Sequence, residues 1–257
     1  MIALALQSVG IIFIYATIWF IISIIKKRND IADIAWGIGY VMLCVFYIIT
    51  QEYSLRATIL YSLVIIWGVR LSIHIFTRNK GKTEDFRYLN WRNEWGKSFL
   101  LRSYFQIYLL QGLFLLIIIS PVAIVAAHNQ PGLTLLDFIG IAVWCIGFYF
   151  QTVGDFQLLR FIKNPLNKGQ VLSTGLWKYT RHPNYFGEVA MWWGIFFISL
   201  HSPHGIYGLI SPLVITFLIL FVSGVPMLER RYDGNSQYEA YRKRTSPFFP
   251  WFRKKIK

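Results

Sequence analysis

Residues that bind metal ions or form disulfides are scarce in this sequence. Its 257 residues include two cysteines, Cys44 and Cys145, and each lies inside a long apolar run. The chain has no CxxC pair and no Cys/His grouping. Disulfide frameworks and structural metal sites depend on such groupings. The sequence therefore predicts neither, and we expect no bound metal.

The sequence also lacks the signs of a soluble nucleotide-binding domain. No GxGxxG motif follows a predicted strand, which excludes a Rossmann fold. There is no internal repeat, no low-complexity tract and no soluble second domain. The pattern predicts a single membrane domain over residues 1–257.

Long apolar runs dominate the chain instead. Apolar residues make up 55% of it, against about 45 to 50% in soluble globular domains. Seven runs are long enough to cross about 30 Å of hydrocarbon as helices. They cover about residues 2–25, 31–50, 55–77, 99–127, 133–157, 184–200 and 205–228. The expected fold is all-α, an integral membrane bundle of about seven transmembrane helices.

Positive charge is abundant and lies on one side of the predicted bundle. The formal net charge is +14, and all of the 26 Lys and Arg residues except Arg56 fall on the same side of the seven spans. Short loops rich in Lys and Arg stay in the cytoplasm. The amino terminus is therefore expected outside and the carboxyl terminus in the cytoplasm. Because the charge follows topology, we expect membrane lipids as partners and no nucleic acid.

One polar motif opens a predicted span. Residues 181–188 read Arg-His-Pro-Asn-Tyr-Phe-Gly-Glu and continue directly into an apolar run. A charged side chain at the centre of a spanning helix costs about 2.5 to 3.5 kcal/mol, and less near its ends. Glu188 lies one turn inside, and Asn184, Glu188 and Trp192 share one helix face because they are four residues apart. This arrangement indicates a functional site.

Other polar residues lie in the same half of the predicted bundle. Asp33 enters the second span, and Gln151 and Asp155 are one turn apart in the fifth. A helical stripe in the third span consists of Trp67, Arg70, His74 and Arg78.

Several of these charges have simpler explanations. His74 suits a helix position held by a hydrogen bond, and Arg70 and Arg78 suit snorkelling to headgroups. The basic tail suits a lipid-phosphate patch. Asp155 and Glu188 differ, because an ionised carboxylate in a span needs an arginine or a ligand amide nearby. We predict a functional role for these two.

The motifs resemble those of a known family. Residues 175–188, Gly-Leu-Trp-Lys-Tyr-Thr followed by the polar motif, are similar to the C-terminal domain of the steroid 5-alpha-reductases. They resemble in particular a bacterial branch of uncharacterised multi-spanning proteins of the DUF1295 type. The matching features extend from about residue 30 and include residues 67–71, Glu84, Asp85, Asp155, and the tail from Tyr241 to Pro247 and Pro250.

The resemblance implies a seven-helix bundle that holds NADPH in a cytosol-facing cavity and receives an apolar small molecule from the bilayer. The cofactor contacts it implies are Arg70, Asp155, Arg181, His182, Asn184, Tyr185, Glu188, Arg230 and Tyr241. The catalytic residues it implies are Asp33, Trp67 and Glu188. Asp33, Trp67 and Trp192 would border the substrate. Arginine forks fit the phosphates of such a cofactor.

The substrate-binding residues depart from the pattern of ketosteroid reductases. Those enzymes use a Glu in the second span and a Tyr in the third to polarise the substrate carbonyl. The best-placed residues here are Asp33 and Trp67. A buried, protonated Asp33 can donate a hydrogen bond, whereas Trp67 donates only through its indole N–H. The departure argues against steroids as substrates and leaves the NADPH prediction unchanged.

The sequence thus predicts an integral-membrane oxidoreductase of a bacterial inner membrane. NADPH would reduce an activated C=C bond in an isoprenoid, sterol-like or fatty enone. A first alternative is an S-adenosylmethionine-dependent membrane methyltransferase, because isoprenylcysteine carboxyl and phospholipid methyltransferases share the Arg-His-Pro-x-Tyr core. Asp155 and the Glu84–Asp85 pair favour the reductase. A second alternative is a non-enzymatic lipid-binding protein, although the spans lack the repeats and broken helices of transporters.

Overall fold

The computed structural model describes residues 1–128 and 132–254, and the regular elements in them are helices apart from one isolated bridge between Thr180 and Ser246. This confirms the all-α prediction. The chain forms two compact units, which are described separately. Unit 1 comprises Met1–Thr134 and Ser199–Ser211, and unit 2 comprises Leu135–Ile198 and Pro212–Lys257. That both belong to a single membrane domain stays a prediction.

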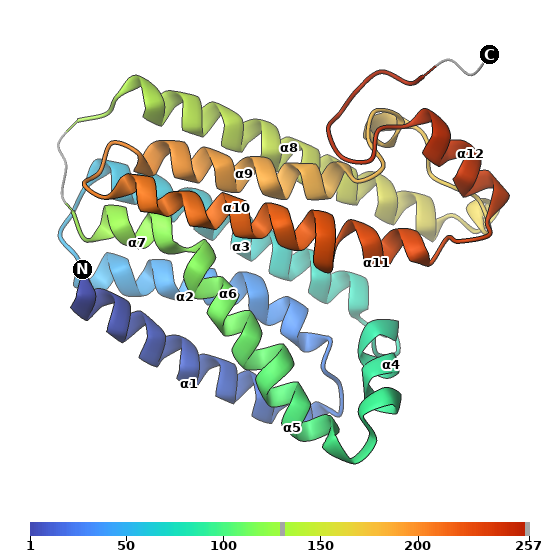
Figure 1. The fold of residues 1–257 in the computed structure, drawn as a ribbon, viewed down its shortest axis with the longest axis horizontal. Coiled ribbons are helices and arrows are strands. Elements are labelled where there is room, and N and C mark those ends of the chain that lie inside the picture. The colour runs from blue at the N-terminus through green and yellow to red at the C-terminus, as the bar shows by residue number, and fades with distance from the viewer. Residues whose placement is uncertain (129–131, 255–257) are drawn as a thin grey trace. The chain divides into compact units, whose positions relative to one another are not determined.

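Unit 1 is built on three long helices, α1 (Ile2–Lys26), α2 (Ile31–Thr50) and α3 (Leu55–Asn79). A broken run of helix follows and lies obliquely across α1 and α2 (Figure 1). It consists of α4 (Phe86–Trp95), η1 (Gly96–Ser98), α5 (Phe99–Ser103), the π-helix η2 (Tyr104–Leu109), α6 (Leu110–Ile118) and α7 (Ser120–Ala126). The 3₁₀ helix η5 (Gly205–Leu209) completes the unit and contacts α7.

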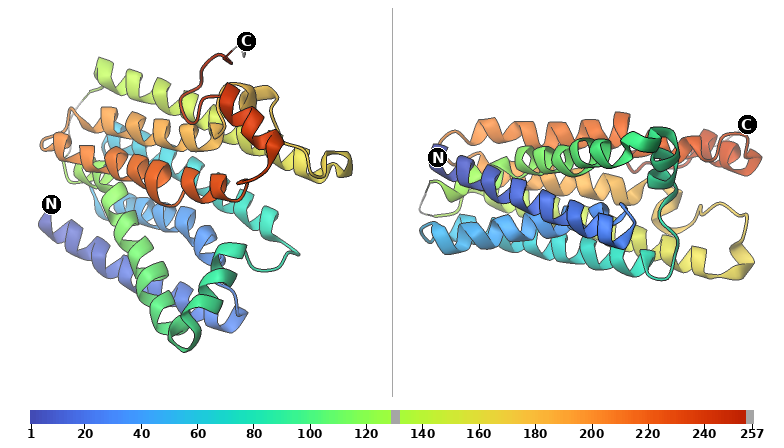
Figure 2. Two further views of the ribbon diagram at one scale, coloured as in Figure 1. Left: turned by 45° about the vertical axis from the view of Figure 1, so that its right-hand side comes forward. Right: turned by 90° about the horizontal axis from the view of Figure 1, so that it is seen from below.

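Unit 2 contains two long helices and a folded tail. Helices α8 (Leu135–Lys163) and α9 (Pro183–Ser199) run side by side in the views of Figures 1 and 2. The segment between them forms η3 (Pro165–Asn167) and η4 (Gly175–Lys178). The helix that starts as α10 (Ile210–Phe217) continues through the π-helix η6 (Leu218–Val222) to α11 (Val225–Arg230), and α12 (Ser236–Arg244) belongs to the tail.

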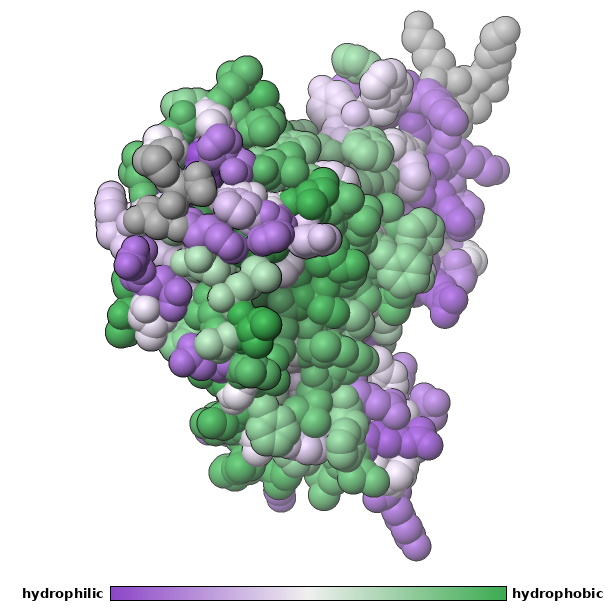
Figure 3. All heavy atoms as spheres, turned by 60° about the vertical axis from the view of Figure 1, so that its left-hand side comes forward, coloured by the Kyte–Doolittle hydropathy of each residue, from purple (hydrophilic) through white to green (hydrophobic). Residues whose placement is uncertain are grey.

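Six helical stretches among the described residues are long and apolar enough to cross a membrane. They are Ile2–Lys26, Ile31–Thr50, Leu55–Asn79, Phe86–Ile118, Leu135–Lys163 and Gly205–Arg230. Figure 3 shows hydrophobic side chains over wide areas of the face it draws, as a lipid-facing surface requires. The sixth predicted run, residues 184–200, falls on α9, whose 17 residues rise about 26 Å. A multi-pass membrane protein is supported, and the count of seven stays a prediction.

The fourth stretch differs from the predicted run at both ends, and two prolines lie near helix boundaries. The fourth stretch begins at Phe86 and ends at Ile118, where the predicted run covered residues 99–127. Pro121 lies in the first turn of α7, and Pro226 lies in the first turn of α11. A proline has no N–H for an intrahelical hydrogen bond, so it fits a helix start. Both prolines mark the start of a helix.

Candidate functional site

Glycines bring α8 and α9 into backbone contact. A Cβ atom on Gly147 would lie 2.5 Å from the carbonyl oxygen of Gly187, and one on Gly140 would lie 2.5 Å from that of Gly194. Gly140 and Gly147 are seven residues apart, as are Gly187 and Gly194, so the contacts recur along both helices. Small residues of this kind let membrane helices approach closely. The side chains flanking the glycines are thereby forced to meet.

Two amide–carboxylate pairs form where α8 and α9 meet. Asn184 Nδ2 donates to Asp155 Oδ1 at 3.0 Å, and Gln151 Nε2 donates to Glu188 Oε2 at 3.2 Å. Asn184 Oδ1 accepts from the backbone N–H of Tyr185 at 3.1 Å, which fixes the direction of its amide. Asp155 and Gln151 are buried. The pairs are one helical turn apart and offer both donors and acceptors.

Arg181 lies just before α9 and is fully engaged by the tail. Its guanidinium binds both carboxylate oxygens of Glu229, at 2.8 and 3.2 Å. It also donates to the backbone carbonyls of Arg242 and Thr245, each at 3.0 Å. Such a bidentate pair is strong and directional. In this structure Arg181 therefore holds the tail against the start of α9.

His182 shares the carboxylate that Arg181 binds. Its Nε2 lies 3.0 Å from Glu229 Oε1, and its ring stacks on Tyr185 with centroids 5.5 Å apart. Burial lowers the pKa of His182 below its usual value, although the hydrogen bond with Glu229 acts in the opposite direction. His182 is therefore neutral at pH 7, and its assignment as a cofactor contact stays a prediction.

The remaining predicted cofactor residues of unit 2 lie in the tail. The Tyr241 hydroxyl donates to the carbonyl of Trp177 at 2.6 Å, so it ties α12 to η4. Burial raises the pKa of Tyr241, which stays protonated. Arg230 ends α11 and is exposed. Trp192, which was predicted to border the substrate, does not lie in the tail. It is buried on α9, one turn beyond Glu188.

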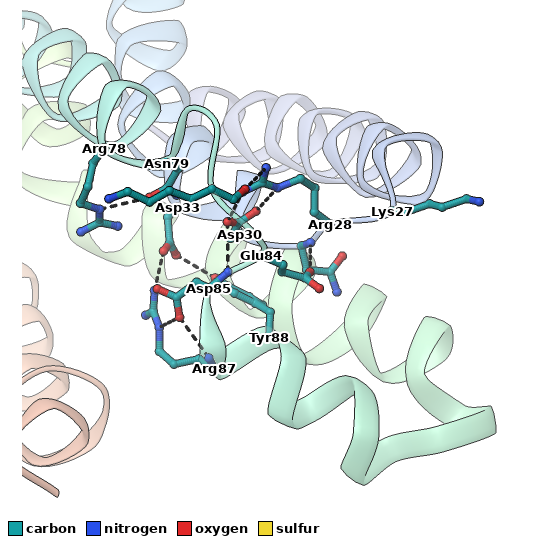
Figure 4. A network of polar contacts seen from close by, with 12 residues as sticks. Lys27, Arg28, Asp30, Asp33, Arg78, Asn79, Glu84, Asp85, Arg87 and Tyr88 are labelled. Carbon is teal, nitrogen blue, oxygen red and sulfur yellow. Dashed lines mark hydrogen bonds and ion pairs between the residues drawn. The ribbon is translucent and has the colours of Figure 1, made fainter. Parts of the chain in front are cut away.

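Asp33 of unit 1 belongs to a different polar network, which joins the starts of α2 and α4 (Figure 4). Its Oδ2 accepts from Arg87 Nη2 at 2.6 Å, and its Oδ1 accepts from the Tyr88 hydroxyl at 2.7 Å. Arg87 also binds Asp85 at 2.9 Å. A carboxylate that accepts from a guanidinium and a phenol is arranged as an acceptor. Both oxygens of Asp33 accept here, and its donation to a substrate carbonyl stays a prediction.

The same network joins two basic loops of unit 1. Arg28 Nη2 binds the buried Asp30 at 2.7 Å, and Asp30 Oδ2 accepts from the backbone N–H of Asp85 at 3.2 Å. Glu84 accepts from the N–H of Asn29 at 2.5 Å. Burial acts to raise the pKa of Asp85, but the hydrogen bonds and charge of Arg87 outweigh it and leave that pKa below its usual value. The loops before α2 and before α4 are thus held together.

The third-span residues are placed by packing. Trp67 is buried, and its ring lies edge-on to Tyr40 with centroids 5.2 Å apart. Arg70 is partly buried one turn further along α3. The described part of the chain holds no group of three His, Cys, Asp or Glu side chains placed to bind a metal ion.

The structure identifies three polar residues that were not among the predicted site residues. Arg87 and Tyr88 bind Asp33, and Glu229 binds Arg181 and His182. Each is a polar residue of a helix at the edge of an apolar run, and that position was the available signal. Their partners are 47 to 55 residues away in sequence, so sequence spacing alone did not pair them.

Comparisons with known proteins give a family. The model of a family described as a protein of unknown function, DUF1295, matches residues 19–245. The chain is also similar to an uncharacterized protein of Schizosaccharomyces pombe, with 26% identity over 207 residues. That match covers 70% of this chain and 60% of the relative, so the chain spans about three-fifths of the relative's length. No solved structure is significantly similar to the chain. Because the family model covers most of the sequence, the protein belongs to the DUF1295 family.

Proposed function

We propose that this protein is an integral-membrane, NADPH-dependent oxidoreductase related to the steroid 5-alpha-reductases. The observation that carries the proposal is the pairing of Asp155 with Asn184 and of Gln151 with Glu188 between two apolar helices. Polar side chains of this kind inside spans are costly and are usually retained for function. Three of the four are the residues that the family resemblance assigns to the cofactor.

The donor and acceptor set suits a nicotinamide carboxamide. That group presents one carbonyl acceptor and one NH₂ donor, and it needs partners of both kinds. Glu188 and Asp155 supply acceptors, and the amides of Asn184 and Gln151 supply both donors and acceptors. NADPH would supply hydride, while Asn184 and Glu188 would fix which face of the ring meets the substrate.

The phosphates of the cofactor need other residues than Arg181. The Arg181 guanidinium already serves Glu229 and two carbonyls. Arg230 is exposed at the end of α11, and Arg70 is partly buried on α3. We assign a phosphate contact to Arg230, since a guanidinium fork matches phosphate oxygens, and the cofactor contact of Arg70 stays a prediction.

Polarisation of the substrate carbonyl is assigned to the network around Asp33. Tyr88 gives its one O–H to Asp33, so the donor to a carbonyl oxygen is the guanidinium of Arg87, which carries five N–H groups. In this proposal Asp33 positions Arg87, whose N–H groups would stabilise negative charge on an enone oxygen. Hydrogen-bond donors directed at developing charge are a large source of catalysis. The substrate would be an isoprenoid, sterol-like or fatty enone that enters from the bilayer.

Ligand-dependent stability tests this proposal directly. A ligand that binds only the folded state raises the free energy of unfolding, by about 2.7 kcal/mol when its concentration is 100 times its Kd. The unfolding temperature rises with it. We expect NADPH, and not S-adenosylmethionine, to raise the unfolding temperature of the detergent-solubilised protein. NADH, which lacks the 2′-phosphate of NADPH, would serve as the control for recognition of that phosphate. Stabilisation by S-adenosylmethionine alone would overturn the reductase proposal in favour of a methyltransferase.

A further inference from the structure

A basic cleft lies in the tail of unit 2, apart from the α8–α9 pairs. It has a volume of about 260 Å³ and is lined by α12, by the segment before η4 and by the last described residues. Its polar lining comes from Ser173, Gln237, Tyr241, Arg244 and Arg253. None of its lining residues is acidic. The cleft is therefore suited to an anion.

The two arginines of the cleft are held differently. Arg253 Nη2 donates to the carbonyl of Ser173 at 2.5 Å, which fixes its guanidinium at one wall. The side chain of Arg244 makes no hydrogen bond or ion pair within residues 1–128 and 132–254, and it is exposed. The backbone N–H of Lys254 donates to the carbonyl of Arg244 at 3.0 Å, so the two walls are tied together. One arginine is fixed in place and the other is available for an anion.

Three exposed aromatic side chains come shortly before Arg253 in the chain. Phe249, Trp251 and Phe252 are 69%, 70% and 77% exposed. The backbone is nevertheless fixed there, because the N–H of Trp251 donates to the carbonyl of Tyr179 at 2.9 Å. Aromatic residues beside Lys and Arg are typical of segments that lie in a membrane interface.

We propose that this cleft binds the phosphate of one anionic phospholipid headgroup while the three aromatic side chains enter the interface beside it. Arg244 and Arg253 would bind the phosphate oxygens, and Gln237 would hydrogen-bond the headgroup. The elements that carry the cleft follow the ends of α8 and α11, two helices of membrane-crossing stretches, which places it at headgroup level. Interfacial aromatics favour a lipid over a free phosphate because a soluble anion makes no use of them.

This inference goes beyond the proposed enzyme activity and does not depend on it. Its test is a binding measurement on the full chain in detergent, titrated with dioctanoyl phosphatidylglycerol, dioctanoyl phosphatidylcholine or inorganic phosphate and followed by thermal unfolding. We expect saturable binding of the phosphatidylglycerol. A basic residue near an anionic surface contributes about fivefold in affinity, so Arg244→Gln with Arg253→Gln should weaken binding about 25-fold.

The matched control removes two positive charges outside the cleft. Lys168 and Lys243 are exposed and do not line it, so Lys168→Gln with Lys243→Gln should change the affinity less than threefold. Equal weakening in both double variants would overturn the site in favour of a diffuse basic surface. The single variant Arg244→Gln separates weaker binding from misfolding. The Arg244 side chain makes no hydrogen bond or ion pair in the described residues, so its replacement should leave the fold unchanged.

The aromatic residues separate the lipid from a soluble anion. Trp251→Ala with Phe252→Ala should weaken phosphatidylglycerol binding at least fivefold and leave any weak binding of inorganic phosphate unchanged. Inorganic phosphate that binds as tightly as phosphatidylglycerol, with no effect of the aromatic variant, would overturn the lipid assignment.

Discussion

The charged side chains near the start of α9 fall into two groups by their hydrogen bonds. Arg181 donates four hydrogen bonds, and its carboxylate partner Glu229 also binds His182. Glu188 instead accepts from a neutral amide, that of Gln151. The first group resembles a structural clamp, and the second pairs a carboxylate with a neutral amide between α8 and α9. Their variants should therefore differ in kind.

Glu188→Gln should separate catalysis from binding. The substitution keeps the volume of the side chain but replaces a carboxylate acceptor with an amide. In the reductase proposal it should lower hydride transfer about 100-fold, because small misplacements of reacting atoms carry costs of that order. NADPH should still raise the unfolding temperature. Unchanged NADPH oxidation by Glu188→Gln, measured with an accepted enone, would contradict the assignment.

Glu229→Gln should lower the free energy of unfolding rather than act on the proposed reaction directly. It leaves the buried Arg181 without its counter-ion, and breaking a buried pair costs about 3 to 5 kcal/mol. The matched control is Glu239→Gln, which breaks an exposed pair with Arg242 at 3.6 Å. Exposed pairs contribute about 0 to 1 kcal/mol. Chemical unfolding should show this difference, and similar losses in both variants would argue against the clamp.

Acid should weaken the clamp through His182. The pKa of this side chain is lowered in the folded state, whereas in the unfolded chain it is about 6.5. The unfolded state therefore binds more protons between these two values, so stability falls as the pH drops below about 6.5. In His182→Gln the free energy of unfolding should depend less on pH between pH 7.5 and 5.5 than it does in the wild type. A parallel pH profile for wild type and variant would contradict this.

At the scale of elements, helix contacts through glycine decide which polar residues meet. In unit 1, a Cβ on Gly68 would lie 2.7 Å from the carbonyl oxygen of Gly37, so α2 and α3 also touch by their backbones. In unit 2 the same kind of contact recurs along α8 and α9. Polar pairs beside such contacts are set by backbone geometry, because neither helix can rotate without a clash.

Gly147→Val should push α8 and α9 apart. The new Cβ would lie 2.5 Å from the carbonyl oxygen of Gly187 and 2.8 Å from the N atom of Met191, and overpacking costs about 1 to 3 kcal/mol. We expect a lower unfolding temperature and weaker NADPH binding. Gly10→Val in α1 is the matched control, since no atom lies within 4 Å of a Cβ there. An equal drop in unfolding temperature in both variants would mean that valine in a helix is destabilising in general, and would contradict a specific role for the contact at Gly147.

At the scale of the whole molecule, basic loops contact one another within each unit. Arg28 Nη1 donates to the carbonyl of Lys82 at 3.1 Å, so the loop before α2 and the loop before α4 lie at the same end of unit 1. In unit 2, Arg253 reaches Ser173, so the tail and the segment before η4 also lie together. Basic loops that share a membrane side are expected to meet in this way.

Cysteine labelling tests which side these loops occupy. In a Cys44→Ala, Cys145→Ala background, single cysteines at Gln51 or His201 should react with an impermeant maleimide added outside intact cells. Cysteines at Lys80 or Lys168 should react only after the membrane is opened. External labelling at Lys168 would contradict the predicted orientation and place the proposed cofactor site on the wrong side.

The sequence by itself determined the membrane character and the helical class of this protein. These follow from local properties: an apolar run long enough to cross the hydrocarbon must satisfy its own backbone hydrogen bonds as a helix. The motif of residues 181–188 could also be recognised from the sequence as a candidate site. A carboxylate such as Glu188 inside an apolar run is energetically costly, and such residues are usually functional.

Only the tertiary structure decided the partners of the charged groups. Arg181 belongs to Glu229, 48 residues away, and Asp33 belongs to Arg87, 54 residues away. No helical spacing relates residues so distant in the chain, since i, i+3 and i, i+4 rules act within one helix. The pairings depend on which backbones pack together and on where the tail folds back. Those are properties of the packed chain, set by backbone contacts and long-range burial.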